Sequence, residues 1–434
     1  MNIYFKKINI NNYLLLLLSV FVSVSIYISD VIIILLCIAW ISSGDLKAKL
    51  LKFTKTPILW STILFFLYFL TSYIWSESSI WNITTQKQAL ILLLPILHTL
   101  KFDESYITKA KYGFLIGLFF NILLSLFTFI YPKNSFFKKG HYDDNLFAHS
   151  FIDHFDYSIF LCFGIILILS LIQRNKNKYY LIIMIIFIIA LLNSYGRIGI
   201  VSLLIFFPIS ILLLSKSKFN FILLFITLIV LLLSFYVFSP FKNRIIDTFN
   251  NIESIYSPPS LEQKIESDAI YLSKQEGLPK EFYINQIKHN SEWMEYINSK
   301  QPQYQTSIGQ RYIYIKNSIL LAKKKPLLGF GSNQFKQIYQ LNFDDKTIKH
   351  PHNNWMFIII ELGVIGLFLA IMIFWHHITQ YFKSKNQSFL KFIFPLFFIL
   401  IMCTDNYFLN HNTLTFFCLF SFLIYNNCTN YKLA

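Results

Sequence analysis

Residues 355–375 read WMFIIIELGVIGLFLAIMIFW, an apolar stretch with a single charged residue, Glu361. A helix needs about 20 mostly apolar residues to cross the hydrocarbon core of a bilayer. An apolar stretch of this length predicts a transmembrane helix rather than a helix of a soluble domain.

The whole chain has the composition of a membrane protein. Of its 434 residues, 55% are hydrophobic and only 14% are charged, whereas soluble domains are about one-quarter charged. The apolar content excludes a disordered chain. The formal net charge of +16 would suit a nucleic-acid-binding protein, but the length of the apolar stretches excludes a soluble one. We therefore expect no nucleic-acid partner.

Twelve segments are apolar enough, or nearly so, to cross a membrane. We expect an all-α polytopic membrane protein of about 12 transmembrane helices, two of which meet at Asp30 and could form a tight hairpin. The predicted spans are 11–29, 30–43, 57–75, 83–100, 112–131, 155–172, 179–194, 197–215, 219–239, 353–381, 389–404 and 412–426.

The positions of Lys and Arg in the short loops predict the orientation, because cytoplasmic loops carry an excess of positive charge. With both termini in the cytoplasm, that side receives Lys6, Lys7, Lys47, Lys49, Lys52, Lys55, Lys101, Lys109, Lys111, Arg174, Lys176, Lys178, Lys216, Lys218, Lys383, Lys385, Lys391 and Lys432. The opposite short segments hold only Lys87, Lys133, Lys138, Lys139 and Arg197. Most of the surplus charge thus indicates topology rather than a binding partner.

One long external segment, 240–351, divides the chain into transmembrane helices over 1–239, a helical loop, and transmembrane helices over 352–434. The loop mixes apolar and charged residues at helical spacing. Its clearest helix is expected to have Ser307 as N-cap and to stop at Pro326, after the three lysines 323–325 that suit the negative end of the helix dipole.

His352 lies where this loop re-enters the membrane. A histidine at such an interface can be neutral and able to accept a proton. From His352 the chain reads His, Asn, nine residues, Gly363, two residues and Gly366.

This pattern resembles that of the bacterial O-antigen ligase and polymerase superfamily. Arg311, followed by KKPLLGFG at 324–331, is similar to a second stretch of that family. The turn at 194–197, SYGR, resembles a third, although two residues separate its Ser from its Arg.

The resemblance implies a GT-C-like fold and transfer of a glycan from a polyprenyl-diphosphate donor to an acceptor hydroxyl. It implies that Arg197 and Arg311 bind the diphosphate leaving group and that His352 is the general base or orients the acceptor. It also implies that no metal or nucleotide cofactor is needed. Guanidinium groups suit the first role because they bind phosphates bidentately.

Three further residues could contact substrate: Lys87, His350 and Asn353. Glu361 should point away from His352, since nine residues of helix amount to about 900° of rotation. We expect it to have a structural partner, because an acid inside a span needs one.

Metal binding is the weaker interpretation of two histidine clusters. His149 and Asp153 have helical spacing near His141, and His350 with His352 would form a pair without an evident third ligand. The sequence Gly329-Phe330-Gly331 lacks the Gly-Lys-Ser/Thr ending of a nucleotide-binding loop.

The leading hypothesis is an O-antigen ligase of the bacterial inner membrane, with its active site facing the periplasm. Its partners would be an undecaprenyl-diphosphate-linked glycan, the lipid A-core acceptor and membrane lipids. The alternatives are an O-antigen polymerase, a protein-directed oligosaccharyltransferase of the same superfamily and, from another class, a polysaccharide or lipid transporter. We find no internal repeat of the kind that many transporters carry.

Overall fold

A computed structural model describes most of the chain. The described residues are 9–130, 151–175, 179–194, 196–214, 239–299, 306–343, 350–384 and 388–426, together with 229, 304 and 348. The chain forms two compact units, Met1–Pro240 with Leu321–Ala434, and Phe241–Leu320.

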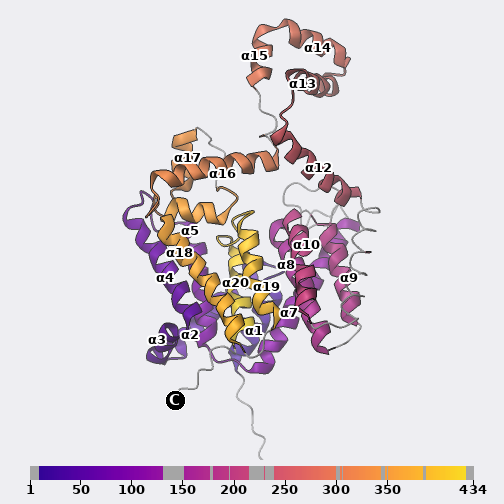
Figure 1. The fold of residues 1–434 in the computed structure, drawn as a ribbon. Helices are drawn as coiled ribbons and strands as arrows, with labels where there is room; N and C mark the ends of the chain where they lie inside the picture. The colour runs from indigo at the N-terminus through magenta and orange to yellow at the C-terminus, as the bar shows by residue number, and fades with distance from the viewer. Residues whose placement is uncertain are drawn as a thin grey trace, which may run out of the picture. The chain divides into compact units, whose positions relative to one another are not determined.

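The described part of the chain is helical, which confirms the all-α prediction for these residues (Figure 1). Its only β-contact is an isolated bridge between Ser25 and Phe151. The helices of the first unit are α1 (Ile10–Phe21), α2 (Ile26–Ser42), α3 (Leu46–Lys55), α4 (Pro57–Thr71), η1 (Ser72–Ile74), α5 (Ile83–Ala89), η2 (Leu90–Leu92), α6 (Leu93–Thr99), α7 (Glu104–Ile130), α8 (His154–Asn175), α9 (Tyr179–Leu192), α10 (Arg197–Leu213), α17 (Phe335–Phe343), α18 (Asn354–Lys383), α19 (Phe389–Met402) and α20 (His411–Tyr425). Helix α12 (Ser239–Tyr256) belongs to the second unit except for its first two residues.

Only four described helices are long and apolar enough to span a membrane by themselves: α4 with η1, α7, α8 and α18. A fifth span results if α2 and α3, which are bent by 111°, count as one. Five more apolar helices have 10–17 residues. The protein is thus a helical, multi-pass membrane protein, but the count of twelve spans is not confirmed.

Two other predicted spans contribute to this difference. The segment 83–100 is divided into α5, η2 and α6 rather than forming one helix. Most of 219–239 lies outside the described residues. The predicted hairpin at Asp30 turns earlier, because α1 ends at Phe21 and Asp30 lies inside α2.

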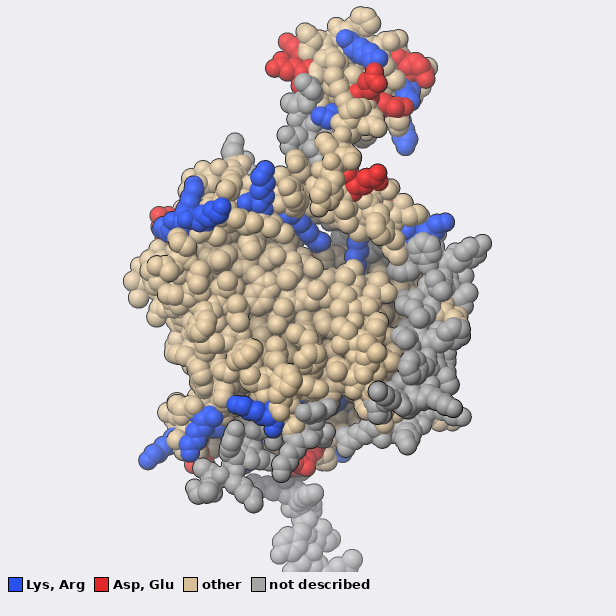
Figure 2. Space-filling model, viewed as in Figure 1, with Lys and Arg blue, Asp and Glu red and all other residues tan. Residues whose placement is uncertain are grey.

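The surface of the first unit agrees with a membrane location. On the face shown in Figure 2, Lys and Arg side chains gather at two opposite ends of the body, and a broad belt without described charged residues separates them. An uncharged belt between two charged ends is what a bilayer requires of a protein that crosses it.

Helix α18 is broken at Gly363. This residue has φ 64° and ψ −167° inside an otherwise helical stretch. The 20 residues after the break, 364–383, would extend about 30 Å, the thickness of the hydrocarbon core. The break therefore separates a span of ordinary length from a short helical segment that follows His352.

The loop between α16 (Ser307–Lys324) and α17 restores the hydrogen bonds that the break removes. In a regular helix Val364 N–H would donate to Ile360 C=O, and Ile365 N–H to Glu361 C=O. Here these carbonyls accept from Phe330 N–H (2.9 Å) and Gly331 N–H (2.8 Å), while Val364 N–H donates to Pro326 C=O (2.8 Å). Backbone groups in a bilayer must be paired within the protein, so the loop and the break form one structural element.

The second unit contains three helices packed on one another, α13 (Leu261–Glu276), α14 (Lys280–His289) and α15 (Ser291–Ser299). Their shared core consists of Ile265, Ala269, Tyr283, Ile287 and Ile297. Ser260 and Gln263 form a capping box at the start of α13. The helical character predicted for 261–300 is confirmed.

Candidate functional site

His352 has an unusual backbone conformation. Its φ is 50°, in the left-handed region that residues with a side chain rarely adopt. The next residue, Asn353, is extended and caps α18 by accepting the N–H of Met356 on its side-chain oxygen (3.0 Å). Left-handed non-glycine residues cost about 1–3 kcal/mol and cluster at functional sites. The helix start therefore fixes the place and direction of the imidazole.

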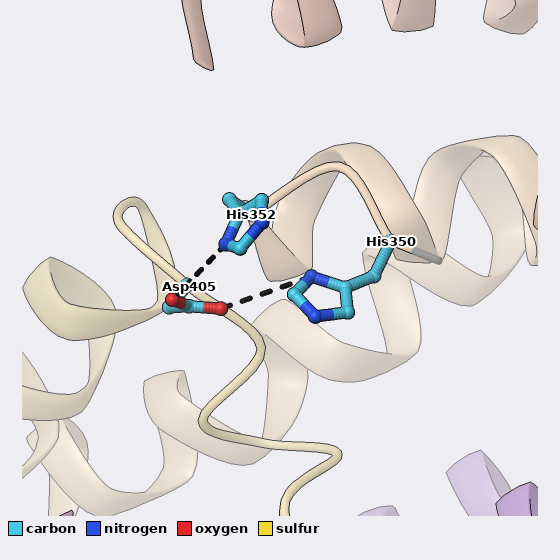
Figure 3. Close-up of side chains that lie close together, drawn as sticks. All are labelled: His350, His352 and Asp405. Atoms are coloured by element: carbon cyan, nitrogen blue, oxygen red, sulfur yellow. Dashed lines mark hydrogen bonds and ion pairs between the residues drawn. The ribbon is translucent and has the colours of Figure 1, made fainter. Parts of the chain in front are cut away.

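Asp405, from the loop between α19 and α20, contacts both histidines of the His-Pro-His sequence (Figure 3). Its Oδ2 lies 3.1 Å from His352 Nδ1, and its Oδ1 lies 3.8 Å from His350 Nδ1. The two rings are 4.2 Å apart between centroids. About one-third of the His352 side chain is exposed, so the ring is both paired and open to solvent.

The loop that carries Asp405 is held along its length. Asn353 donates its amide to Cys403 C=O (3.0 Å), and the Asn354 side-chain oxygen accepts Phe408 N–H (2.9 Å). Farther along, Asn410 and Asn412 donate to the buried carboxylate of Asp156 on α8, at 3.0 and 3.1 Å. Contacts with two helices thus position the carboxylate that faces His352.

The contact with His352 also determines the charge state of Asp405. Burial alone would raise the pKa of this carboxyl, but the hydrogen bonds from His352 and from the Asn406 N–H, together with the nearby imidazoles of His352 and His350, outweigh burial and lower the pKa below its ordinary value. An ionised Asp405 accepts a hydrogen bond, so the proton of neutral His352 is placed on Nδ1. Nε2 then carries the lone pair that can accept a proton from a hydroxyl.

Arg197 is the first residue of α10. A cation at the positive end of a helix dipole does not stabilise the helix, so its presence there calls for another explanation. A Cβ atom on Gly196 would approach Ser158 Oγ to 1.9 Å. Arg197 thus begins its helix where the chain packs closely against Ser158 of α8. The role of Arg197 in the site stays a prediction.

Arg311 lies on α16, in the second unit. The helix ends before Pro326 as predicted, but it begins at Ser307 itself rather than after it. Its cap, however, is Thr306, whose hydroxyl accepts Gly309 N–H at 3.0 Å. The prediction of Ser307 as N-cap was wrong by one residue. The role of Arg311 in the site stays a prediction.

Lys87 lies on α5, half-buried. The loop before α5 is tied to the residues before α17: Ser76 donates to Ser332 C=O (2.7 Å), and Thr84 donates to Asn333 Oδ1 (2.9 Å). Polar contacts therefore fix α5 beside the loop that bridges the broken helix. The substrate contacts proposed for Lys87, His350 and Asn353 stay predictions.

Glu361 has the structural partner expected of an acid in a span. Its carboxylate accepts Asn333 N–H (2.9 Å) and Phe335 N–H (3.0 Å) at the start of α17. The positive end of a helix and its unpaired N–H groups compensate a negative charge there. Glu361 thus caps α17.

Metal binding has more support from the structure than from the sequence. Among the described residues, His350, His352 and Asp405 form one group whose ligand atoms lie within 4.8 Å of one another. Asp405 is the third ligand that the sequence did not reveal, and three protein ligands are the usual number in a catalytic zinc site. The segment with His141 and His149 lies outside the described residues.

Sequence reasoning missed Asp405. It lies 53 positions after His352, in no motif. The available signal was its place between the predicted spans 389–404 and 412–426, where it is the only acidic residue. An acid at the same end of the membrane as an unexplained histidine is a candidate partner for it.

Comparison with known proteins bears on the same region. Residues 182–371 match the family model described as O-antigen ligase. No curated protein matches the chain. The matched stretch includes Arg197, Arg311, His352, Gly363 and the loop that bridges α18. Residues 182–371 are therefore similar to the O-antigen ligase family, which supports an assignment to the O-antigen ligase and polymerase group.

Proposed function

We propose that the protein is an O-antigen ligase, which transfers a polysaccharide from undecaprenyl diphosphate to a sugar of lipid A-core. The observation that carries this proposal is the hydrogen bond from His352 to Asp405, because it orients a possible base, His352, that lies within the matched residues 182–371. The reaction would take place at the periplasmic side of the inner membrane, with both termini in the cytoplasm.

In this mechanism His352 Nε2 takes the proton of the acceptor hydroxyl. The hydroxyl oxygen forms a bond to the anomeric carbon of the donor glycan while the bond from that carbon to the diphosphate breaks. The electron pair leaves with undecaprenyl diphosphate. Attack opposite the leaving group inverts the anomeric configuration. Asp405 keeps the imidazole oriented and stabilises it once it is protonated.

Arg197 and Arg311 would stabilise the charge that gathers on the departing diphosphate. Guanidinium groups can form paired hydrogen bonds with phosphate oxygens and remain charged at any physiological pH. Because the energy of transfer resides in the lipid-linked donor, no nucleotide is needed.

We also propose that the reaction needs no metal. In this mechanism His352 and Asp405 act as a hydrogen-bonded base (3.1 Å), and the two arginines carry the charge of the leaving group. Transfer that continues unchanged after chelation and dialysis would agree. Loss of transfer, with recovery on adding one particular divalent cation, would instead assign the His350–His352–Asp405 group to a metal centre.

The test of the function is a reconstituted assay with purified lipid-linked glycan and two separate acceptors. Attachment of glycan to lipid A-core supports the ligase. Extension of a second lipid-linked glycan would identify a polymerase, and glycan on a protein acceptor would identify an oligosaccharyltransferase. Movement of intact lipid-linked donor across the vesicle membrane, without transfer, would indicate a transporter.

A further inference from the structure

Six consecutive residues at the end of α16 and in the following loop are all exposed, Lys323 to Leu328. The first three are lysines, and the last three are Pro, Leu and Leu. The exposed fractions are 67% for Leu327 and 48% for Leu328. Cations are thus followed directly by large apolar side chains that no other part of the described protein covers.

This segment is held firmly in place. The backbone carbonyls of Pro326 and Leu327 accept the N–H groups of Val364 and Ile365 at the break in α18. A Cβ atom on Gly363 would approach Leu327 C=O to 2.1 Å, so the two backbones touch. Lys325 Nζ lies 4.9 Å from the centre of the Phe330 ring, and Lys324 bonds to the Asn342 side chain. The exposed leucines therefore belong to a fixed surface.

The apolar surface continues along α18 beyond the break. Val364, Phe368, Ile371 and Trp375 are exposed large side chains. Their spacing of four, three and four residues places them on one face of the helix. This face extends about 16 Å from the bridging loop toward the other side of the membrane. Together with Leu327 and Leu328 it forms a stripe that begins at three lysines.

An anionic headgroup followed by a long apolar tail is the chemistry that this surface fits. We propose that the lysines at 323–325 make the first contact with the diphosphate of the polyprenyl donor, before Arg197 and Arg311 stabilise it during transfer, and that Leu327, Leu328 and the exposed face of α18 bind the first units of its isoprenoid tail. The inference rests on the proposed function for the identity of the donor. A diphosphate carries more charge than the single phosphate of a bulk phospholipid, which matches three adjacent cations.

Photo-crosslinking tests this docking without relying on catalysis. The full-length protein in phosphatidylglycerol nanodiscs would receive a polyprenyl diphosphate that carries a photoreactive group in its first isoprene units. We expect crosslinks at 327–328 and at the exposed positions of 364–375. The proposal is overturned if crosslinks map elsewhere, or if excess phosphatidylglycerol removes them as effectively as unlabelled polyprenyl diphosphate does.

Two sets of variants separate the tail from the headgroup. Leu327→Ala with Leu328→Ala should lower crosslinking severalfold, whereas Leu204→Ala, at an exposed position of α10, should not. Each single replacement of a lysine by glutamine, at 323, 324 or 325, should raise the donor concentration that half-saturates crosslinking. The increase should be roughly fivefold, as expected for the loss of one cation at a membrane surface. Lys47→Gln and Lys55→Gln are the controls, and an equal effect in them would refute the headgroup contact.

The variant His352→Ala distinguishes this inference from the proposed function. It should crosslink like the unchanged protein, because docking does not use the base. If the unchanged protein crosslinks at the predicted stripe but transfers no glycan, the proposed function is refuted and the docking surface stands. If the unchanged protein transfers glycan but does not crosslink at the stripe, the docking surface is refuted and the proposed function stands.

Discussion

His352 combines a left-handed backbone with a carboxylate partner 53 residues away in the sequence. The histidine could be predicted from its motif and its place at the membrane interface. Asp405 could not, because its position depends on how Asn353, Asn354 and Asp156 hold the loop between α19 and α20. Only the folded chain reveals that the predicted base has a partner.

The stability contributed by Asp405 should depend on pH. Because its pKa is lowered in the folded protein, its contribution is complete above the ordinary carboxyl value of about 4 and is lost as the pH falls through the lowered value. Asp405→Asn should cost about 1.5–3 kcal/mol at neutral pH, the range for a hydrogen bond to a charged group.

Thermal unfolding of the two purified proteins across pH measures this. The gap in melting temperature should be full at neutral pH and narrow below about pH 4. The control is Asp103→Asn, at another loop aspartate, whose carboxylate accepts a hydrogen bond from the uncharged Asn12 side chain rather than from a histidine. Its gap in melting temperature should change less with pH. A gap that is constant through the acid range would mean that Asp405 is not held ionised by His352.

At the scale of elements, the broken helix explains two motifs that looked separate in the sequence. The glycines at 329, 331 and 363 all have positive φ and lie where the bridging loop meets α18. The sequence predicted a single uninterrupted span over 353–381. It could not reveal the break, because the loop that replaces the helical hydrogen bonds comes from another part of the chain.

Gly363→Ala should therefore destabilise the protein strongly. A left-handed φ costs a non-glycine residue about 1–3 kcal/mol, and the new Cβ would overlap Leu327 C=O. Gly113→Ala on α7 is the matched control, since its Cβ would come no closer than 3.1 Å to any neighbour, and its nearest neighbours are the side chains of Leu16 and Val20. Equal melting temperatures for the two variants would contradict the close contact at the break.

Glu361→Gln tests the cap on α17. Glutamine keeps the size of the side chain but turns an amide NH₂ toward backbone N–H groups that now bind a carboxylate oxygen. The loss should be about 1–3 kcal/mol, as for other buried groups left without a partner. In thermal unfolding Glu77→Gln, at an exposed acid bonded to Gln337, should have little effect. An unchanged melting temperature in Glu361→Gln would contradict the role of this carboxylate as the cap of α17.

At the scale of the whole molecule, the sequence predicted a helical membrane protein and the helical character of the external segment. It overstated the regularity of the spans, because hydropathy measures apolar length and does not register breaks such as those within 83–100. The orientation rests on the distribution of Lys and Arg alone.

Reporter fusions test that orientation. A reporter placed after Thr248 should be external, and one placed after Gly44 should be cytoplasmic, because Lys47, Lys49, Lys52 and Lys55 follow it. Protection of both reporters on the same side would contradict the predicted topology. A cytoplasmic reporter after Thr248 would also place the long segment on the wrong side for a periplasmic enzyme.

The central claim is that His352, oriented by Asp405, is the base for glycan transfer. The most direct measurement is the transfer rate of His352→Ala in proteoliposomes with purified lipid-linked donor and lipid A-core, with His376→Ala, at a half-buried histidine of α18, as the control. We predict a fall of at least about 10²-fold for His352→Ala, the size of a lost general base, and little change for the control. Full transfer by His352→Ala would contradict the account.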